Sequence, residues 1–135
     1  MVKLIVGVKG TGKTKTLIGL VNAAANAAPG CVVCLEKGTK LIHEIKYTAR
    51  LIDTDEYLIT NAEMLYGMIA GCYASNHDVM QIFLDSALKI CNNDMDEFIK
   101  FVYRAEEFSK KHGIDIVMTS SIPVEEVREE LKKYL

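Results

Sequence analysis

Residues 7–14 of this chain read GVKGTGKT and Lys15 follows them; the members are Gly7, Val8, Lys9, Gly10, Thr11, Gly12, Lys13 and Thr14. The spacing fits G-x-x-x-x-G-K-[ST], the Walker A pattern, in which backbone N–H groups of a glycine-rich loop surround phosphate oxygens. An apolar run at 4–6 precedes the loop, and a helix-compatible run at 16–28 follows it. A strand, a glycine loop and a helix in this order are the setting that the pattern requires. We therefore predict a phosphate-binding loop at residues 7–15.

Each residue type in this loop has a chemical role. Gly7, Gly10 and Gly12 allow the positive φ angles that turn N–H groups inward. The N-terminus of the following helix adds its dipole, which favours a bound anion. We expect Lys13 to reach the β- and γ-phosphate oxygens, and Thr14 to offer its hydroxyl to a magnesium ion that the phosphates also hold. The loop therefore predicts a nucleoside triphosphate with Mg²⁺ as the ligand.

The composition is that of a globular protein. Half of the 135 residues are apolar and a quarter are charged, so we expect residues 1–135 to form a single domain. The net charge of −2, without any basic cluster beyond lysine pairs, argues against nucleic-acid binding. No window is long and apolar enough for a membrane span, and the N-terminal apolar run is too short for a signal peptide. We expect a cytoplasmic protein with no nucleic-acid or membrane partner.

Hydrophobic periodicity and turn residues predict alternating strands and helices. We expect strands at 4–6, 31–35, 79–85 and 114–119. Helices are expected at 13–28 with a stop at Pro29-Gly30, at 61–72, at 94–112 with a capping box of Asp94 and Glu97, and after Pro123. Residues 38–60 give the weakest signal, with a short helix at 39–45 and extended pieces at 48–53 and 57–59.

Strands that alternate with helices indicate βαβ units, and hence a mainly parallel sheet with helices on both faces. The expected architecture is a three-layer α/β/α sandwich with the P-loop NTPase fold. Ligands of such sheets bind at the carboxyl ends of the strands. This rule places the glycine loop, Glu36, Asp85 and residues 119–121 together.

Two carboxylates at strand ends are the candidates for metal and water chemistry. Asp85 closes an apolar strand, as expected for a residue that holds magnesium directly or through water. Many phosphate-loop ATPases place a glutamate directly after this aspartate, but here the position is Ser86. Glu36 is the best-placed residue to orient an attacking water. The alternative, which has equal weight, is that Glu36 is only a solvated turn residue beside Lys37.

The segments 7–14, 31–36 and 82–86 together resemble the nucleotide-binding core of RecA-like ATPases, within the additional-strand division of the P-loop NTPase superfamily. The resemblance implies a catalytic glutamate at the end of the second strand and a serine after the magnesium-associated aspartate, which match Glu36 and Ser86. It also implies a polar sensor, for which Thr119 and Ser120 are in position. The further strands, DNA-binding loops and subunit contacts of RecA-like motors are missing from this short chain, so their activity is not carried over.

Short proteins of this kind are sometimes labelled twitching-motility ATPases. The acidic and histidine boxes of that family are missing here, so its function is not carried over either.

Other side chains carry weaker signals. Four cysteines are expected to be buried free thiols, because Cys31 and Cys34 lie three apart in a strand and point to opposite faces. Each of the three arginines could stabilise transition-state charge, although a surface role is the simpler account; they are Arg50, Arg104 and Arg128. The histidines lack the spacing of metal ligands; they are His43, His77 and His112.

The sequence thus predicts binding of ATP with Mg²⁺, and favours ATP over GTP because no N-K-x-D motif is present. The first hypothesis is a slow ATPase in which Lys13 stabilises charge, Thr14 and Asp85 position magnesium, and Glu36 orients water. Fast turnover would then need a protein partner or self-assembly into a homo-oligomer. The second hypothesis is a nucleotide-binding regulatory module with little hydrolysis, and the third is a small-molecule kinase.

Overall fold

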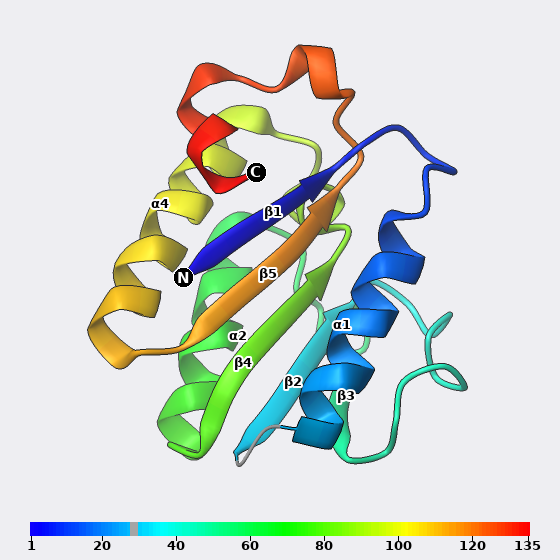
Figure 1. Ribbon diagram of the computed structural model, residues 1–135. Helices are drawn as coiled ribbons and strands as arrows, with labels where there is room; N and C mark the ends of the chain where they lie inside the picture. Colours follow the sequence, from blue (N-terminus) through cyan, green and yellow to red (C-terminus); the bar gives the residue numbers. More distant parts are fainter. Residues whose placement is uncertain (28–29) are drawn as a thin grey trace.

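Five parallel strands form one sheet with helices on both faces in the computed structural model, which describes residues 1–27 and 30–135 (Figure 1). The strands are β1 (Val2–Val6), β2 (Cys31–Glu36), β3 (Ala49–Asp53), β4 (Val79–Asp85) and β5 (Asp115–Ser120). The helices are α1 (Lys13–Ala27), α2 (Ala62–Ser75), α3 (Ala87–Ile90), α4 (Met95–His112) and the 3-10 helices η1 (Val124–Glu126) and η2 (Glu129–Tyr134). The predicted α/β/α sandwich is confirmed.

The strand order is β1-β5-β4-β2-β3, so β5 lies between the first strand and β4. Helices α3 and α4 connect the neighbours β4 and β5, whereas residues 37–48 connect the neighbours β2 and β3 without a regular helix; a parallel pair cannot be joined by a tight turn. All the carboxyl ends therefore lie at one edge of the sheet, where Val6 is in register with Ser120 and Glu36 with Asp85. The glycine loop leaves β1 at this edge, as the arrowheads in Figure 1 show.

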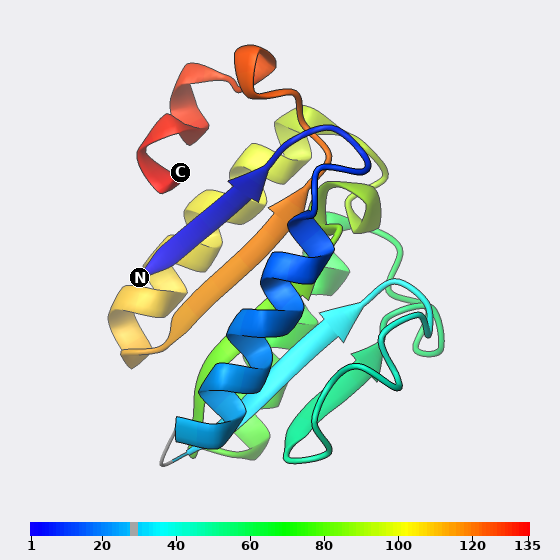
Figure 2. The same ribbon diagram turned by 45° about the vertical axis from the view of Figure 1, so that its right-hand side comes forward.

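Two apolar layers hold the helices to the sheet. Figures 1 and 2 show α1 alone on one face, and α2 and α4 on the other. The larger core lies on the α2 and α4 side and includes the fully buried side chains of Leu65, Ile82 and Phe98. The smaller core lies beneath α1 and includes Leu17 and Val21. Each fully buried side chain of this size contributes about 1.5–3 kcal/mol, so both layers stabilise the sheet.

The predicted helix boundaries are confirmed where local capping signals mark them. Asn61 accepts a hydrogen bond from the Met64 N–H at 2.8 Å and begins α2. Gly113 ends α4 in the left-handed region, with φ of 68°. The first helix extends to Ala27, and its predicted last residue and proline stop, Ala28 and Pro29, lie outside the described residues.

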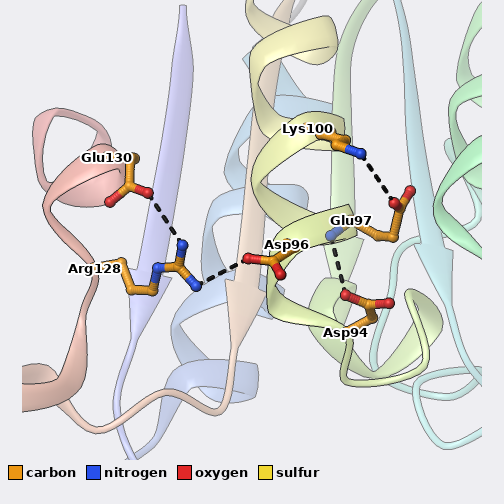
Figure 3. Close-up of polar contacts among 6 residues, drawn as sticks. All are labelled: Asp94, Asp96, Glu97, Lys100, Arg128 and Glu130. Atoms are coloured by element: carbon orange, nitrogen blue, oxygen red, sulfur yellow. Dashed lines mark hydrogen bonds and ion pairs between the residues drawn. The ribbon is translucent and has the colours of Figure 1, made fainter.

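The capping box at the start of α4 forms only in part. The Glu97 N–H donates to Asp94 Oδ1 at 3.2 Å, as Figure 3 shows. The Glu97 carboxylate pairs with Lys100 at 3.3 Å, and the Asp94 N–H, which would complete the box, donates instead to the Cys91 carbonyl at 3.1 Å.

Between Glu36 and α2, only β3 agrees with the prediction. Residues 39–45 form turns and bends and no regular helix. The Glu36 carboxylate accepts the N–H groups of Lys40 and Leu41 at the start of these turns. Residues 57–59 form a turn and not an extended piece. The Ile59 N–H donates to the Thr54 carbonyl at 3.0 Å and so closes this turn.

One further prediction is wrong, and one short helix was missed. The chain after Pro123 forms two 3-10 helices instead of an α-helix, and Figure 3 shows Arg128 between them, paired with Asp96 of α4 at 3.1 Å and with Glu130 at 3.2 Å. These contacts, with Leu131 buried, pull the segment onto α4. The short helix α3 was not predicted; it begins after Ser86, whose φ of 60° turns the chain sharply out of β4.

Candidate functional site at the phosphate loop

The loop between β1 and α1 has the backbone conformation that its glycines predict. Gly7, Gly10 and Gly12 have φ angles of 153°, 88° and 88°. A Cβ atom at Gly7 would lie 2.5 Å from Thr11 Oγ1, so this position excludes larger residues for steric reasons as well. The expected positive φ angles are confirmed.

Three donors of the loop converge on one carbonyl. The Val8 oxygen accepts hydrogen bonds from Thr11 N at 3.3 Å, from Thr11 Oγ1 at 2.7 Å and from Lys13 Nζ at 3.0 Å. The ammonium group of Lys13 therefore lies across the loop, and its charge is placed where the loop would surround an anion.

Asp85 joins three elements at the carboxyl edge of the sheet. Its Oδ1 accepts hydrogen bonds from Thr119 Oγ1 at 2.8 Å and from Thr14 Oγ1 at 3.2 Å. Thr119 Oγ1 in turn accepts the Ser86 N–H at 2.9 Å. The Asp85 side chain is 7% exposed, so these bonds fix a nearly buried carboxylate beside the first turn of α1. The structure thus brings Thr14, Asp85 and Thr119 together; Ser120 instead accepts the Leu88 N–H and is buried.

A cavity of about 490 Å³ lies over this edge, and five of the thirteen lysines of the chain line it. They are Lys9, Lys13, Lys15, Lys40 and Lys89. Among the lining residues only Asp85 carries a negative charge. None of the five lysines forms an ion pair with residues 1–27 or 30–135. A chain with a net charge of −2 therefore carries a local excess of positive charge at this cavity, which attracts a polyanion.

Glu36 lies next to Asp85 in strand register but does not line the cavity. Its side chain is 2% exposed, so the alternative of a solvated turn residue is wrong. Oε1 accepts the Lys40 N–H at 2.8 Å and Oε2 accepts the Leu41 N–H at 3.1 Å. Burial raises the pKa of Glu36 above its ordinary value of 4.5, although the two N–H groups act in the opposite direction.

The raised pKa of Glu36 leads to a prediction about stability. Because the folded-state pKa lies above the unfolded value, the contribution of Glu36 favours folding at pH below 4.5 and is lost as pH rises through the folded-state pKa. We expect Glu36→Gln to remove this loss, so that the stability of the variant relative to the wild type increases between about pH 4 and about pH 7.5. Urea unfolding at both pH values measures the difference. A relative stability that falls with pH would contradict the assignment.

The other candidate side chains lie away from the cavity. The Arg104 guanidinium stacks over the Tyr66 ring at 3.8 Å, and Arg128 is paired on α4. His77 and His112 both pack against the Tyr73 ring. All four cysteines are free, as expected, but only Cys34 and Cys91 are buried, and Cys31 and Cys72 are partly exposed. Within residues 1–27 and 30–135 no group of three or more His, Cys, Asp or Glu side chains could hold a metal. In the same ranges, no helix combines the length and hydrophobicity of a bilayer span.

The residues at the cavity fit a magnesium-bound triphosphate. The Thr14 hydroxyl and the Asp85 carboxylate, 3.2 Å apart, are hard oxygen ligands, and Mg²⁺ commonly takes one or two protein oxygens together with phosphates and water. The five lysines provide the charge that a triphosphate requires.

Sequence reasoning missed two of these lysines, Lys40 and Lys89. Neither belongs to a spaced motif, because Lys40 follows β2 in a segment of weak signal and Lys89 lies in the short helix α3. The only signal was their proximity to the strand ends that carry Glu36 and Asp85.

Comparisons with known proteins bear on the fold. No protein-family model and no curated protein matches this chain. A solved structure of a KaiC-like protein from the hyperthermophilic archaeon Pyrococcus horikoshii OT3 superposes with a TM-score of 0.73 at 15% sequence identity. The match covers 98% of this chain and 66% of the KaiC-like chain, which is less than two thirds of that protein. The chain therefore shares its α/β fold with a KaiC-like protein.

Proposed function

We propose that the chain binds ATP with Mg²⁺ at the Walker A loop of residues 7–15 and hydrolyses it slowly. The observation that carries the proposal is the lysine-lined cavity, with Thr14, Asp85 and Thr119 hydrogen-bonded at its base. Cation, hydroxyl and carboxylate at a glycine loop are the groups that a magnesium-bound triphosphate needs.

Each group has a distinct task in this proposal. The loop N–H groups and Lys13 bind the phosphates and stabilise the negative charge that develops during transfer. Thr14 Oγ1 and Asp85 would hold the magnesium ion, which when bound neutralises phosphate charge. Thr119 donates to Asp85 and so keeps the carboxylate oriented before the ligand arrives. Because Asp85 is already oriented, little reorganisation of this carboxylate accompanies binding, whereas the Lys13 ammonium exchanges the Val8 carbonyl for phosphate oxygens.

The expected slow rate follows from the position of Glu36. Hydrolysis needs a group that orients the attacking water. Glu36 is the proposed group, yet it is 2% exposed and both of its oxygens accept backbone N–H groups. Asp85 is the only carboxylate among the residues that line the cavity in the described ranges. The lack of a second carboxylate at the cavity also favours the second candidate function, a regulatory module that binds ATP and hardly hydrolyses it. For faster hydrolysis, a protein partner or a second copy in a homo-oligomer would supply the group that orients water.

Phosphate release by the wild type and by Glu36→Gln distinguishes the two candidates. For a slow ATPase we expect release above the blank, a loss of release in the variant, and a dissociation constant for ATP that changes by less than about threefold. Glutamine keeps an acceptor for one of the two N–H groups of Lys40 and Leu41, so part of the contact that holds the segment remains. ATP binding without release in the wild type would support the regulatory module. Equal release by both proteins would remove Glu36 from the mechanism.

A further inference from the structure

The residues that line the cavity are polar or charged, apart from its glycines, and offer no stacking surface to a base. They are lysines, glycines, hydroxyl side chains and one aspartate. Most small-molecule sites are lined by apolar and aromatic side chains. In the described ranges, no aromatic and no large apolar side chain lines this cavity. Affinity at this site must therefore come from charge and hydrogen bonds to the phosphate chain.

Four of the five lysines belong to the glycine loop, to α1 or to α3, and Lys40 comes from a separate segment, residues 37–48. The start of this segment is fixed by the Glu36 carboxylate, which binds the Lys40 N–H at 2.8 Å and the Leu41 N–H at 3.1 Å. The Leu41 side chain is buried in the small core with Leu17 of α1.

The end of the segment is fastened to the same helix. Asn22 of α1 donates through Nδ2 to the Glu44 carbonyl at 2.8 Å and accepts the Lys46 N–H at its Oδ1 at 2.9 Å. Both ends of the segment are thus held against the helix that begins at Lys13. The backbone of Lys40 has a fixed position relative to the phosphate loop, so its ammonium group reaches the cavity without an ordering step for the main chain.

We propose that this cavity selects its ligand by the phosphate chain and not by the base, and that Lys40, which lies outside the Walker A loop on a segment held in place by Glu36 and Asn22, recognises the charge of that chain. The ligand class is a polyphosphate, which a nucleoside triphosphate or an inorganic polyphosphate can supply. This inference rests on the proposed function in one respect, that the Walker A loop binds phosphates; it does not require that the ligand be ATP or that the ligand be hydrolysed.

Titration calorimetry with ATP, GTP and inorganic tripolyphosphate, each with Mg²⁺, tests the proposal. For the wild type we expect GTP to bind within about threefold of ATP, and tripolyphosphate within about tenfold. Lys40→Ala should weaken all three ligands by about tenfold, since a hydrogen bond from a charged group to phosphate is lost. Lys40→Arg retains the charge and should retain most of the affinity.

Lys46→Ala is the matched control. It removes one lysine from the same segment, but Lys46 Nζ donates to Asn26 Oδ1 at 2.8 Å and does not line the cavity. We expect unchanged affinities for this variant. Equal effects of Lys40→Ala and Lys46→Ala would overturn the role of Lys40. Saturable binding of ATP without binding of GTP or of tripolyphosphate would overturn selection by the phosphate chain.

The outcomes separate this inference from the proposed function. Binding of tripolyphosphate without ATP would contradict the proposed function and leave the inference standing. If ATP binds and Lys13→Ala abolishes this binding while Lys40→Ala has no effect, the proposed function is supported and the role of Lys40 is contradicted. If the wild type binds none of the three ligands, both are wrong.

Discussion

Lys13→Ala is expected to weaken the binding of ATP with Mg²⁺ by between roughly tenfold and a hundredfold, because hydrogen bonds from charged groups contribute about 1.5–3 kcal/mol. The Lys13 ammonium lies 3.0 Å from the Val8 carbonyl across the loop, where the phosphates would be surrounded. Titration calorimetry of wild type and variant with ATP measures the change.

The fold should tolerate this substitution. The bond from Lys13 to the Val8 carbonyl is exposed, and Thr11 also donates to that carbonyl through its N–H and its hydroxyl. Circular dichroism is expected to give the wild-type spectrum for the variant, so that a loss of affinity reports on binding. An unchanged dissociation constant in a folded variant would show that Lys13 does not contact the ligand.

Asp85→Asn is expected to remove the gain in ATP affinity that Mg²⁺ provides and to abolish phosphate release. Asparagine retains an oxygen that can accept from Thr14 and Thr119, so the local structure is preserved. Its neutral amide is a much weaker partner for a hard cation than a carboxylate is. We expect Mg²⁺ to raise the affinity of the wild type for ATP by about tenfold or more, and that of the variant by less than about threefold.

Titrations with Mg²⁺ and with EDTA measure both numbers. Asp78→Asn removes the same charge from an exposed position at the opposite end of β4, and its magnesium effect should equal that of the wild type. The same magnesium effect in Asp85→Asn and in the wild type would exclude Asp85 as a magnesium-binding residue.

The parts of the fold that the sequence predicts well are those with local signals. Strand β2 begins with a continuous apolar run at 31–35, and α4 has an N-cap at Asp94, a regular apolar face and a glycine stop at Gly113. The Walker A spacing fixes the loop, because its glycines are needed for backbone conformation and Lys13 and Thr14 for ligand chemistry. Asp85 followed from the rule that parallel strands end at one edge.

The parts that the sequence does not predict depend on distant contacts. The turned segment that follows β2 is held against α1 by Asn22, which donates to the Glu44 carbonyl and accepts the Lys46 N–H. The 3-10 geometry after β5 accompanies an ion pair between Arg128 and Asp96, which lie 32 residues apart. Neither contact can be predicted from the helix or strand propensity of the residues nearby.

The candidate site shows the same division. Thr14, Asp85 and Thr119 come from segments that the pattern placed at one edge, and they are hydrogen-bonded there. Lys40 and Lys89 line the cavity without any spacing rule, since a lysine side chain is long and its reach depends on how its backbone is held. The sequence correctly placed Glu36 at the end of its strand, but it did not predict that the carboxylate would bind backbone N–H groups.

The central claim, that residues 7–15 bind ATP with Mg²⁺, is tested most directly by two-dimensional ¹⁵N–¹H NMR of the 135-residue protein during titration with the nucleotide. Amide groups that surround phosphates should shift the most. We expect saturable shifts concentrated at Gly10, Gly12, Lys13 and Thr14, with smaller shifts at Ser86, whose N–H donates to Thr119. Absence of shifts in these amides at saturating nucleotide, or shifts confined to another face of the sheet, would contradict the account.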